Sequence, residues 1–395
     1  MKSKGIYTCL FFMGMGIHSL LFAQDSMVLG VYSPHGTRSG VLKAAQAQNV
    51  QAYCFGHDSK VDWDKKTISY GRVFENDRWC IKYNLPLPKV VYDYSFYYLG
   101  KNRPFREYSH HYLQELKDKL NVPFINPGHI SDQISDKRFT GKIMQEYGVP
   151  HPETHLSGPD INRQMISKFD YLFFKPQMGC QGSGIFNITK ENGMLISRFK
   201  VESAPDVWVD AQVGPLPEES LEDIIAESKR QMKISAKNPY LVQQGIKAFE
   251  LRGAPTYMRV LTQRGEDGKL DCTALGSRLN GHNSQGGSSE HYAVITGPLA
   301  KSSKCKYGQV TVESNFLQVA VKAHEAIEKK FGTKVGELGM DLVADENGDV
   351  YFIEANPKCG VKSIFPYNDT CEQRASDLRD EKVVSFARHL HESKK

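Results

Sequence analysis

The segment that most constrains the fold is residues 336–360, GELGMDLVADENGDVYFIEANPKCG. Two apolar runs flank Asn347-Gly348, a residue pair typical of two-residue turns between antiparallel strands. The pattern predicts a β-hairpin in which Asp341 lies directly opposite Glu354, whereas a longer turn at 345–349 would break this pairing. Four apolar side chains are expected on the other face of the hairpin: Leu342, Ala344, Tyr351 and Ile353.

Asn356 shares a face with Glu354, because side chains alternate along a strand. Two carboxylates directly opposed on paired strands repel each other unless a cation lies between them. Oxygen ligands of this kind suit Mg²⁺, which takes one or two carboxylates and completes its shell with water and substrate phosphates. We therefore expect a metal site at Asp341, Glu354 and Asn356. A solvated acidic hairpin is the alternative interpretation.

A glycine-rich segment, FFKPQMGCQGSGI, occupies residues 173–185. Lys175 ends a predicted strand, and the loop after it carries Gly179, Gly182 and Gly184. Glycines let backbone N–H groups approach phosphate oxygens, and a lysine supplies a compact positive charge. The spacing fits neither the Walker A motif nor the dinucleotide fingerprint. The segment predicts either a phosphate-binding loop or a flexible hairpin with a surface lysine.

Two arginines lie in predicted strands ahead of the hairpin, Arg259 in TYMRVLTQ and Arg278 in TALGSRLNG. An arginine that faces inward from a sheet needs an anion, and a bidentate phosphate or carboxylate is the usual partner. A surface position or a salt bridge is the alternative for each of them. Residues 280–289, NGHNSQGGSS, predict either a substrate loop or a plain linker.

The bulk composition excludes several classes of protein. The chain has 395 residues, 40% hydrophobic and 24% charged, which is enough for two or three folded domains. The net charge of +5 is spread along the sequence, which argues against a nucleic-acid-binding face. None of the eight cysteines forms a C-x-x-C pair, so we expect reduced structural thiols rather than disulfides or a zinc site.

The order of predicted elements indicates an α/β architecture. From Met27 the chain reads strand (MVLGVYS), glycine-bearing loop, helix (VLKAAQAQ) and strand (VQAYCFG). A second unit starts with a helix capped by Ser135 or Asp136, and residues 205–237 read as a loop followed by an amphipathic helix. The predicted units are a terminal extension 1–26, an α/β domain 27–130, a glycine-loop unit 131–245, a metal-hairpin unit 246–368 and a charged C-terminal helix 369–395.

These pieces, in this order, resemble the ATP-grasp superfamily, and within it the YheC/YheD-like group of endospore coat-associated proteins. The motifs that carry the resemblance include WCIKYNLPLPKVVYDYSFY, HPETH, FFKPQMGCQGSGI, YLVQQGI, MRVLTQ and ELGMDLVADENGDVYFIEANPKCG. The resemblance implies an N-terminal α/β domain followed by two antiparallel-sheet subdomains that hold ATP between them. It also implies an association with the spore coat.

The resemblance assigns roles to individual residues. It implies that ATP phosphates meet Lys137 and Lys175, and that two Mg²⁺ ions bind at the carboxylates of the hairpin. It implies that Arg259 and Arg278 steady the γ-phosphate and an acyl-phosphate intermediate. One departure is Tyr257, where the family has an aspartate two residues before the first arginine. The nucleotide-binding set that the resemblance implies is completed by Gly179, Gly182, Ser183, Gly184, Gln243, Gln244, Gly245, Ile246 and Glu250.

The expected activity is an ATP- and Mg²⁺-dependent ligation of a carboxylate to an amine through an acyl phosphate, with both substrates unidentified. Phosphoryl transfer of this kind depends on positioning and charge neutralisation, which Mg²⁺, lysines and arginines supply. One alternative is a non-catalytic spore-coat protein that retains the fold, and another is a kinase that stops at phosphoryl transfer.

Residues 1–26 leave the cellular location of the protein open. MKSK and the apolar stretch after it resemble a secretory signal peptide, although His18 interrupts that stretch and no membrane span is predicted. Met27 begins a predicted strand, so residues 1–26 also fit a start of translation assigned too far upstream. Because ATP is scarce outside the cytoplasm, we expect a cytoplasmic protein, with export as the alternative.

Overall fold

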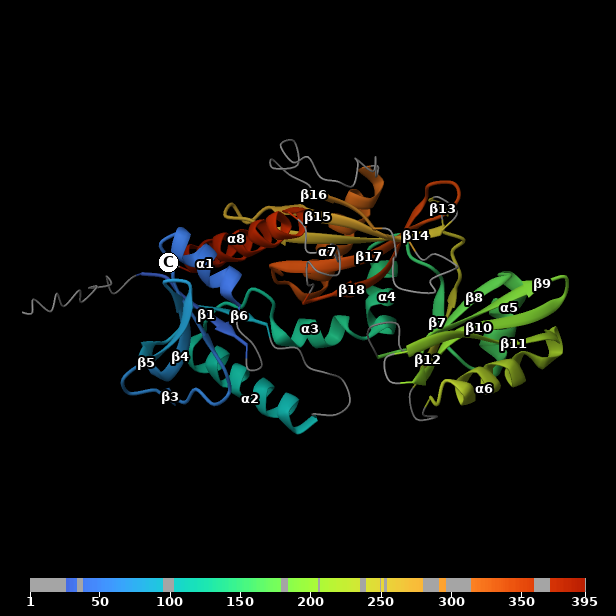
Figure 1. The fold of residues 1–395 in the computed structure, drawn as a ribbon, viewed down its shortest axis with the longest axis horizontal. Helices are drawn as coiled ribbons and strands as arrows, with labels where there is room; N and C mark the ends of the chain where they lie inside the picture. Colours follow the sequence, from blue (N-terminus) through green and yellow to red (C-terminus); the bar gives the residue numbers. More distant parts are fainter. Residues whose placement is uncertain are drawn as a thin grey trace, which may run out of the picture.

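The computed structural model describes residues 26–33, 38–94, 103–178, 184–204, 207–234, 239–248, 250–251, 254–279, 291–295, 314–358 and 370–394. Within these ranges the strands form three six-stranded sheets. The sheets follow one another along the long axis of the molecule, with the N-terminal sheet at one end and the sheet of β8–β12 at the other (Figure 1).

The N-terminal sheet is mixed, in the order β3-β4-β2-β1-β6 with β5 added to β4. Its parallel centre forms because β1 and β2 are joined through helix α1, a crossover that parallel strands require. The sequence analysis missed the β4–β5 hairpin, whose turn at Asn76-Asp77 has two positive φ angles. The elements are β1 (Val28–Tyr32), α1 (Ser39–Ala47), β2 (Gln51–Phe55), β3 (Val61–Asp62), β4 (Thr67–Glu75), β5 (Arg78–Pro86), β6 (Val90–Asp93) and α2 (Arg103–Leu120).

The second sheet is antiparallel, in the order β11-β10-β9-β8-β12-β7. Its core gathers strand residues such as Phe174 and Phe186, whose rings stack, around Ile224 of α6. The loop expected at the start of 205–237 is wrong, because strand β11 lies there before α6. The elements are β7 (Thr154–Leu156), α5 (Pro159–Lys168), β8 (Tyr171–Pro176), β9 (Phe186–Glu191), β10 (Met194–Ala204), β11 (Val207–Pro217), α6 (Leu221–Gln231) and β12 (Tyr240–Gln244).

The third sheet is also antiparallel, in the order β16-β15-β14-β17-β18, with β13 paired to β14. Its core packs Met340 and Leu342 against Ile327 of α7 and Ile143 of α4. The capping prediction for α4 is confirmed, since Asp136 accepts backbone hydrogen bonds from Arg138 and Phe139. The elements are α3 (Gly128–Ile134), α4 (Lys137–Glu146), β13 (Glu250–Leu251), β14 (Ala254–Arg264), β15 (Leu270–Leu279), β16 (His291–Ile295), α7 (Ser314–Phe331), β17 (Glu337–Ala344) and β18 (Val350–Asn356).

The C-terminal helix α8 (Thr370–Glu392) joins the N-terminal sheet to the third sheet. Val383, Val384 and Phe386 pack in one core with Val41 and Leu42 of α1. Figure 1 shows α8 lying between α1 and the strands β14 and β15. The helix is therefore part of a shared core rather than an appendage.

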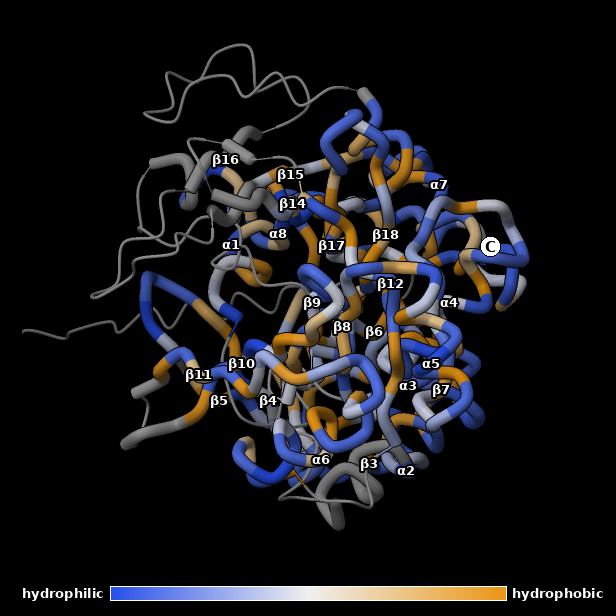
Figure 2. Tube along the Cα trace, turned by 90° about the vertical axis from the view of Figure 1, so that its right-hand side faces the viewer, coloured by the Kyte–Doolittle hydropathy of each residue, from blue (hydrophilic) through white to orange (hydrophobic). Residues whose placement is uncertain are grey.

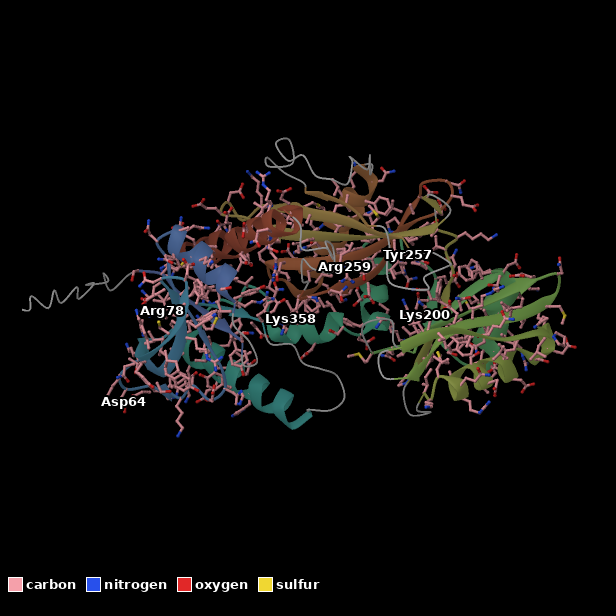
Figure 3. The ribbon with its side chains drawn as sticks, viewed as in Figure 1. Asp64, Arg78, Lys200, Tyr257, Arg259 and Lys358 are labelled. Atoms are coloured by element: carbon pink, nitrogen blue, oxygen red, sulfur yellow. The ribbon has the colours of Figure 1, made fainter. Side chains whose placement is uncertain are left out.

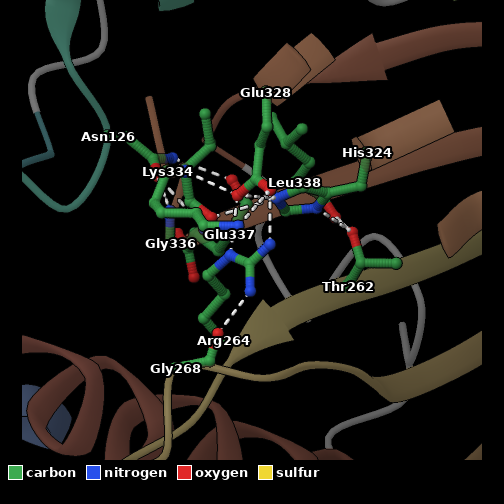
Figure 4. Close-up of polar contacts among 11 residues, drawn as sticks. Asn126, Thr262, Arg264, Gly268, His324, Glu328, Lys334, Gly336, Glu337 and Leu338 are labelled. Carbon is green, nitrogen blue, oxygen red and sulfur yellow. Dashed lines mark hydrogen bonds and ion pairs between the residues drawn. The ribbon is translucent and has the colours of Figure 1, made fainter. Parts of the chain in front are cut away.

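Buried polar contacts reinforce this junction. Arg264 of β14 forms an ion pair with Glu328 of α7, and both side chains are 6% exposed. Nearby, His324 shares a 2.8 Å hydrogen bond with Thr262, and Asn126 binds the backbone of β17 (Figure 4). Buried ion pairs of this kind are tolerated only when each group is paired.

The hydrophobic segments of the chain lie mainly in strands and in the helix faces that cover them, and hydrophilic segments occupy outer turns (Figure 2). Among the helices in the described residues, none has the length and apolar character needed to cross a bilayer. Cys54, Cys80 and Cys272, the cysteines whose side chains are described, are free thiols.

Candidate active site

The β17–β18 hairpin has the predicted pairing but not the predicted turn. Asp341 lies opposite Glu354, which confirms the expectation. The two-residue turn is wrong, because Asp345 and Asp349 close a longer turn with a 2.9 Å backbone hydrogen bond. A β-bulge between Asp341 and Leu342 shifts the register back, so the longer turn and the bulge compensate each other.

The longer turn also changes which side chains face the core. Leu342 and Ala344 are buried as expected, but their partners in the core are Val350 and Phe352. Tyr351 and Ile353, which were expected on that face, are only partly buried. The expected faces are wrong here because the longer turn shifts β18 by one residue as far as the bulge, where Ile353 is the extra residue.

The three expected metal ligands lie together. The amide of Asn356 donates long hydrogen bonds of 3.4 Å to both Asp341 and Glu354. Arg259 on the neighbouring strand β14 donates two hydrogen bonds to the two carboxylate oxygens of Asp341. The site therefore combines two facing carboxylates, one amide and one guanidinium.

The electrostatics of this pair are unequal. Burial raises the pKa of Asp341 to about 6, against the opposing effect of Arg259. Burial also acts to raise the pKa of Glu354, but the hydrogen bond from Asp341 and the charges of Lys137, Lys175 and Arg259 outweigh it and lower that pKa. The two carboxyl groups compete for cations, and Asp341 is the one whose ionisation is costly.

Lys175, at the end of β8, is buried at 4% exposure and points to Gln243 of β12. Its ammonium donates a 2.8 Å hydrogen bond to the side-chain oxygen of Gln243, whose amide donates a 2.8 Å bond to Thr154. Burial lowers the pKa of Lys175 to about 8, while the charge of Glu354 acts in the other direction. The lysine is thus held in a fixed place near the carboxylate pair.

Lys137 opens helix α4 beside the same strand. Its backbone N–H donates a 3.1 Å hydrogen bond to the carbonyl of Gln177, and the side chain of Gln177 donates a 2.7 Å bond to Asp136. Lys137 and Lys175 both act on the pKa of Glu354. Helix α4, strand β8 and strand β18 therefore bring two lysines and a carboxylate to one site.

Arg259 and Tyr257 lie on β14, on the side of the third sheet that is nearer the second sheet (Figure 3). Burial raises the pKa of Tyr171 on β8, and the nearby Tyr257 raises it further. The two tyrosines, on β8 and β14, are thus close enough for the charge of one to act on the other. On the adjacent strand β15, the backbone of Arg278 pairs with that of Tyr257.

The segment after β12 connects the two sheets. Gln244 exchanges hydrogen bonds with Glu153, and the N–H of Gly245 donates a 2.7 Å bond to the carbonyl of Tyr171. A shallow polar pocket lies between Gln244–Lys247 and the hairpin turn, where Tyr351 forms one wall. Ile246 is buried at 8% exposure within this segment.

The remaining predicted site residues are placed in part. Gly184 has a φ of +75° and accepts a 2.7 Å hydrogen bond from Tyr240, so the end of the glycine loop is tied to β12. The backbone of Glu250 pairs with that of Pro255 in β13. Gly179, Gly182 and Ser183 lie outside the described residues.

The donor set fits Mg²⁺. In the described part of the chain no group of three or more His, Cys, Asp or Glu side chains gathers, and this pair of carboxylates lies within the one or two that Mg²⁺ usually takes from a protein. Burial raises the pKa of Asp341, the charge of Glu354 raises it further, and a cation between the two carboxylates would relieve their repulsion. Asn356 would add its carbonyl oxygen after turning its amide away.

Comparison with known families shows which family the chain belongs to. A family model described as YheC/D like ATP-grasp matches residues 130–390, well over half of the sequence. The chain belongs to this family. The sequence of the endospore coat-associated protein YheD of Bacillus subtilis is 24% identical over 355 residues, which cover 86% of this chain and 71% of that protein. The expected family and fold are therefore confirmed.

Solved structures share the ATP-grasp fold. One is the ATP-grasp ligase PsnB complexed with a phosphomimetic variant of a minimal precursor, Mg and ADP. It superposes with a TM-score of 0.53 at 14% sequence identity, and the match covers 90% of the present chain and 99% of the PsnB chain. D-cycloserine synthetase DcsG gives a TM-score of 0.50 at 12% identity over 90% and 99% of the two chains. A shorter match is to the tetrahydromethanopterin:alpha-L-glutamate ligase of Methanocaldococcus jannaschii, 35% identical over 72 residues, or 18% of this chain and 24% of that ligase.

One feature of the site escaped the sequence analysis. Gln243 was expected only as a member of the nucleotide-binding set, yet its side chain binds Lys175. Arg259 was expected either at a phosphate or in a salt bridge, and in the structure it forms a salt bridge with Asp341. The alternation of buried residues along β12 could have indicated an inward-facing Gln243, but no pattern in the sequence names its partner.

Proposed function

We propose that this protein is an ATP- and Mg²⁺-dependent ligase that joins a carboxylate to an amine through an acyl phosphate. The observation that carries the proposal is the half-buried pair Asp341–Glu354 with Arg259, Lys137 and Lys175 around it. Such a constellation is suited to holding a cation and the phosphates of a nucleotide at one place. The ligase names of the related structures support the same class of reaction.

In the proposed reaction a substrate carboxylate oxygen attacks the γ-phosphorus of ATP, and ADP leaves. An amine then attacks the acyl carbon, phosphate leaves, and the amine nitrogen loses a proton to give an amide. Bound Mg²⁺ would neutralise phosphate charge at Asp341, Glu354 and Asn356. Lys137 and Lys175 would bind phosphate oxygens, and Arg259 would exchange Asp341 for the transferred phosphoryl group.

The binding of the base and ribose is a finer part of the proposal. We propose that the backbone of Gln244–Ile246 meets the adenine, because this segment joins the two sheets. Glu250 would meet the ribose, and Arg278 would meet the phosphoryl group from β15. We further propose that the protein acts in the cytoplasm, where ATP is available.

The first test is thermal shift of the full chain with ATP alone, Mg²⁺ alone and both together. A ligand present at 100 times its Kd adds about 2.7 kcal/mol of stability, so binding at one site should raise Tm clearly only when both are present. No shift under any condition would contradict the proposal and would favour a structural protein that retains the fold.

The second test separates ligase from kinase. ATP-dependent phosphate release should require both a carboxylate and an amine, and hydroxylamine can serve as a general amine that traps an acyl phosphate. Product formed with a carboxylate but without any amine would indicate a kinase that stops at phosphoryl transfer.

A further inference from the structure

Strand β5 carries an open edge at the end of the molecule farthest from the β8–β12 sheet (Figure 1). Among the described strands it pairs only with β4, over eight residue pairs from Glu75–Arg78 to Thr67–Pro86. Its outer edge therefore presents backbone N–H and C=O groups to solvent. Open edges of this length are templates for pairing with another chain.

The side chains of this edge are unusually apolar for a surface. Of the four large apolar side chains that are exposed in the described residues, two lie on β5, namely Ile81 at 55% and Tyr83 at 71% exposure. Trp79 shares their face, because side chains alternate along the strand, and its ring packs edge-on against Phe74 at 5.2 Å. One face of the edge thus carries an apolar row in which Ile81 and Tyr83 are exposed and Trp79 is half-buried against the core of the N-terminal sheet.

The sequence of β5 is self-complementary in one antiparallel register. With Ile81 opposite Ile81 of a second copy, Trp79 faces Tyr83 and Cys80 faces Lys82. A register centred on Cys80 instead would place Arg78 of one copy opposite Lys82 of the other. A register centred on Lys82 would place the two copies of Lys82 opposite each other. Like charges directly opposite each other destabilise a sheet, so the charges select the register centred on Ile81.

Lysine on an edge strand often prevents pairing, but here its charge is compensated. Lys82 forms an ion pair with Glu75 of the same hairpin. The edge therefore has neither a free charge at its centre nor a proline before Pro86. The devices that usually protect an edge from a second chain are weak on β5.

We propose that two copies of this chain associate through antiparallel pairing of their β5 strands, with Ile81 on the two-fold axis. The N-terminal sheets of the two copies then continue into one sheet. The pairing leaves the site between the second and third sheets open, because β5 lies at the opposite end of the molecule (Figure 1). The proposal does not depend on the proposed function.

The decisive test uses the fact that residue 81 faces itself. Light scattering after size-exclusion chromatography should give a mass near twice the 44.6 kDa of one chain, measured over a concentration series. Ile81→Lys and Ile81→Glu should each give monomers, because like charges then meet on the axis. An equimolar mixture of the two variants should recover the dimer, since a lysine then faces a glutamate.

Matched controls lie on the edges of the second sheet, where Leu156 and Val209 are exposed at 42% and 43%. Leu156→Lys and Val209→Lys add the same charge to other edge strands and should leave the dimer mass unchanged. Circular dichroism of each variant checks that it is folded. A monomeric wild-type chain, or a dimer that survives Ile81→Lys, would overturn the proposal.

A second test leaves the apolar row intact. Lys82→Cys places a thiol opposite Cys80 of the other copy, so mild oxidation should give a covalent dimer on a non-reducing gel. Lys66→Cys, in the turn before β4, adds a thiol of similar exposure and should stay monomeric on the same gel. Equal cross-linking of the two variants would contradict the β5 register.

Discussion

Strand β17 carries two carboxylates with opposite surroundings, Glu337, which is buried, and Asp341, which is half-buried. Glu337, at its start, is fully buried and accepts hydrogen bonds from Tyr92, Arg379 and Gln263, at 2.6 to 3.2 Å. Asp341, four residues further along the same face, contacts Arg259 and a second carboxylate. The first group joins three parts of the fold, and the second lies among cations at the candidate site.

The difference lies in the balance of charge. Around Glu337, Arg379 supplies the opposite charge and neutral donors complete the shell, so nothing more is needed. Around Asp341 and Glu354, three cations (Arg259, Lys137 and Lys175) surround two carboxylates, and burial raises the pKa of Asp341 to about 6. A closed buried pair holds a fold together, whereas a site whose charges are not matched one to one is suited to take a metal ion together with phosphate.

The largest expected effect is at the closed pair. Arg379→Met leaves Glu337 buried without its cation, and removal of one partner of a buried pair costs about 3–5 kcal/mol of the free energy of unfolding. Urea denaturation measures this loss. Arg374→Met, an exposed arginine on the same helix, should change the stability by less than about 0.5 kcal/mol. Equal stabilities of the two variants would remove the distinction between the two regions.

The next effect is at the open pair, and it should appear in activity. Glu354→Gln should lower Mg²⁺-dependent turnover at least about 100-fold, since second-shell groups of metal sites alone are worth about 10–100-fold. Stability should change less than for Arg379→Met, because lost attraction to Lys175 and lost repulsion from Asp341 offset each other. Steady-state phosphate release measures the first effect. Glu346→Gln, an exposed residue in the same hairpin, should retain full turnover.

The pH dependence of stability should separate the two regions by their response to metal. Burial raises the pKa of both Asp341 and Asp380 from 3.8 to about 6, so the folded state holds protons that the unfolded state has lost. Stability should therefore fall by about 1–3 kcal/mol per group as pH rises from about 4 to 6. Denaturation at pH 4.5 and 6.5 measures the fall.

Binding of Mg²⁺ and nucleotide should abolish the part of this pH-dependent loss of stability that comes from Asp341. The part that comes from Asp380, which lies near Arg38 and Arg379, should remain. Asp380→Asn is the matched variant, because it should remove the metal-insensitive share alone. A fall that Mg²⁺ and nucleotide leave unchanged in Asp380→Asn would contradict the assignment to Asp341.

The smallest effect is expected at the support of Lys175. Gln243→Met removes the 2.8 Å hydrogen bond that Gln243 accepts from the ammonium of Lys175, a contact worth about 1.5 kcal/mol. The substitution should weaken nucleotide binding roughly tenfold. Isothermal titration of the nucleotide measures the change. Gln244→Met removes a side-chain contact to Glu153 instead and should weaken binding less. Equal affinities for the two variants would show that Lys175 needs no such support.

Much of the hairpin could be predicted from the sequence, because its information is local. Apolar alternation around Asn347-Gly348 predicts Asp341 opposite Glu354, and the pairing holds although the turn is longer than expected, because a bulge compensates for it. The bulge that corrects the register could not be predicted, because it depends on how Phe352 packs into the core under the third sheet. The helix cap at Asp136 is local in the same way.

The sequence by itself determined the family, the order of the elements and the two carboxylates that face each other, since these follow from periodicity and motif within short segments. Only the tertiary structure decided that Gln243 holds Lys175, 68 residues away, and that Arg259 binds Asp341, 82 residues away. It also decided that α8 joins two sheets and that β5 keeps an open edge. Alternation fixes which face a side chain takes, but its partner is chosen only when separate elements pack together.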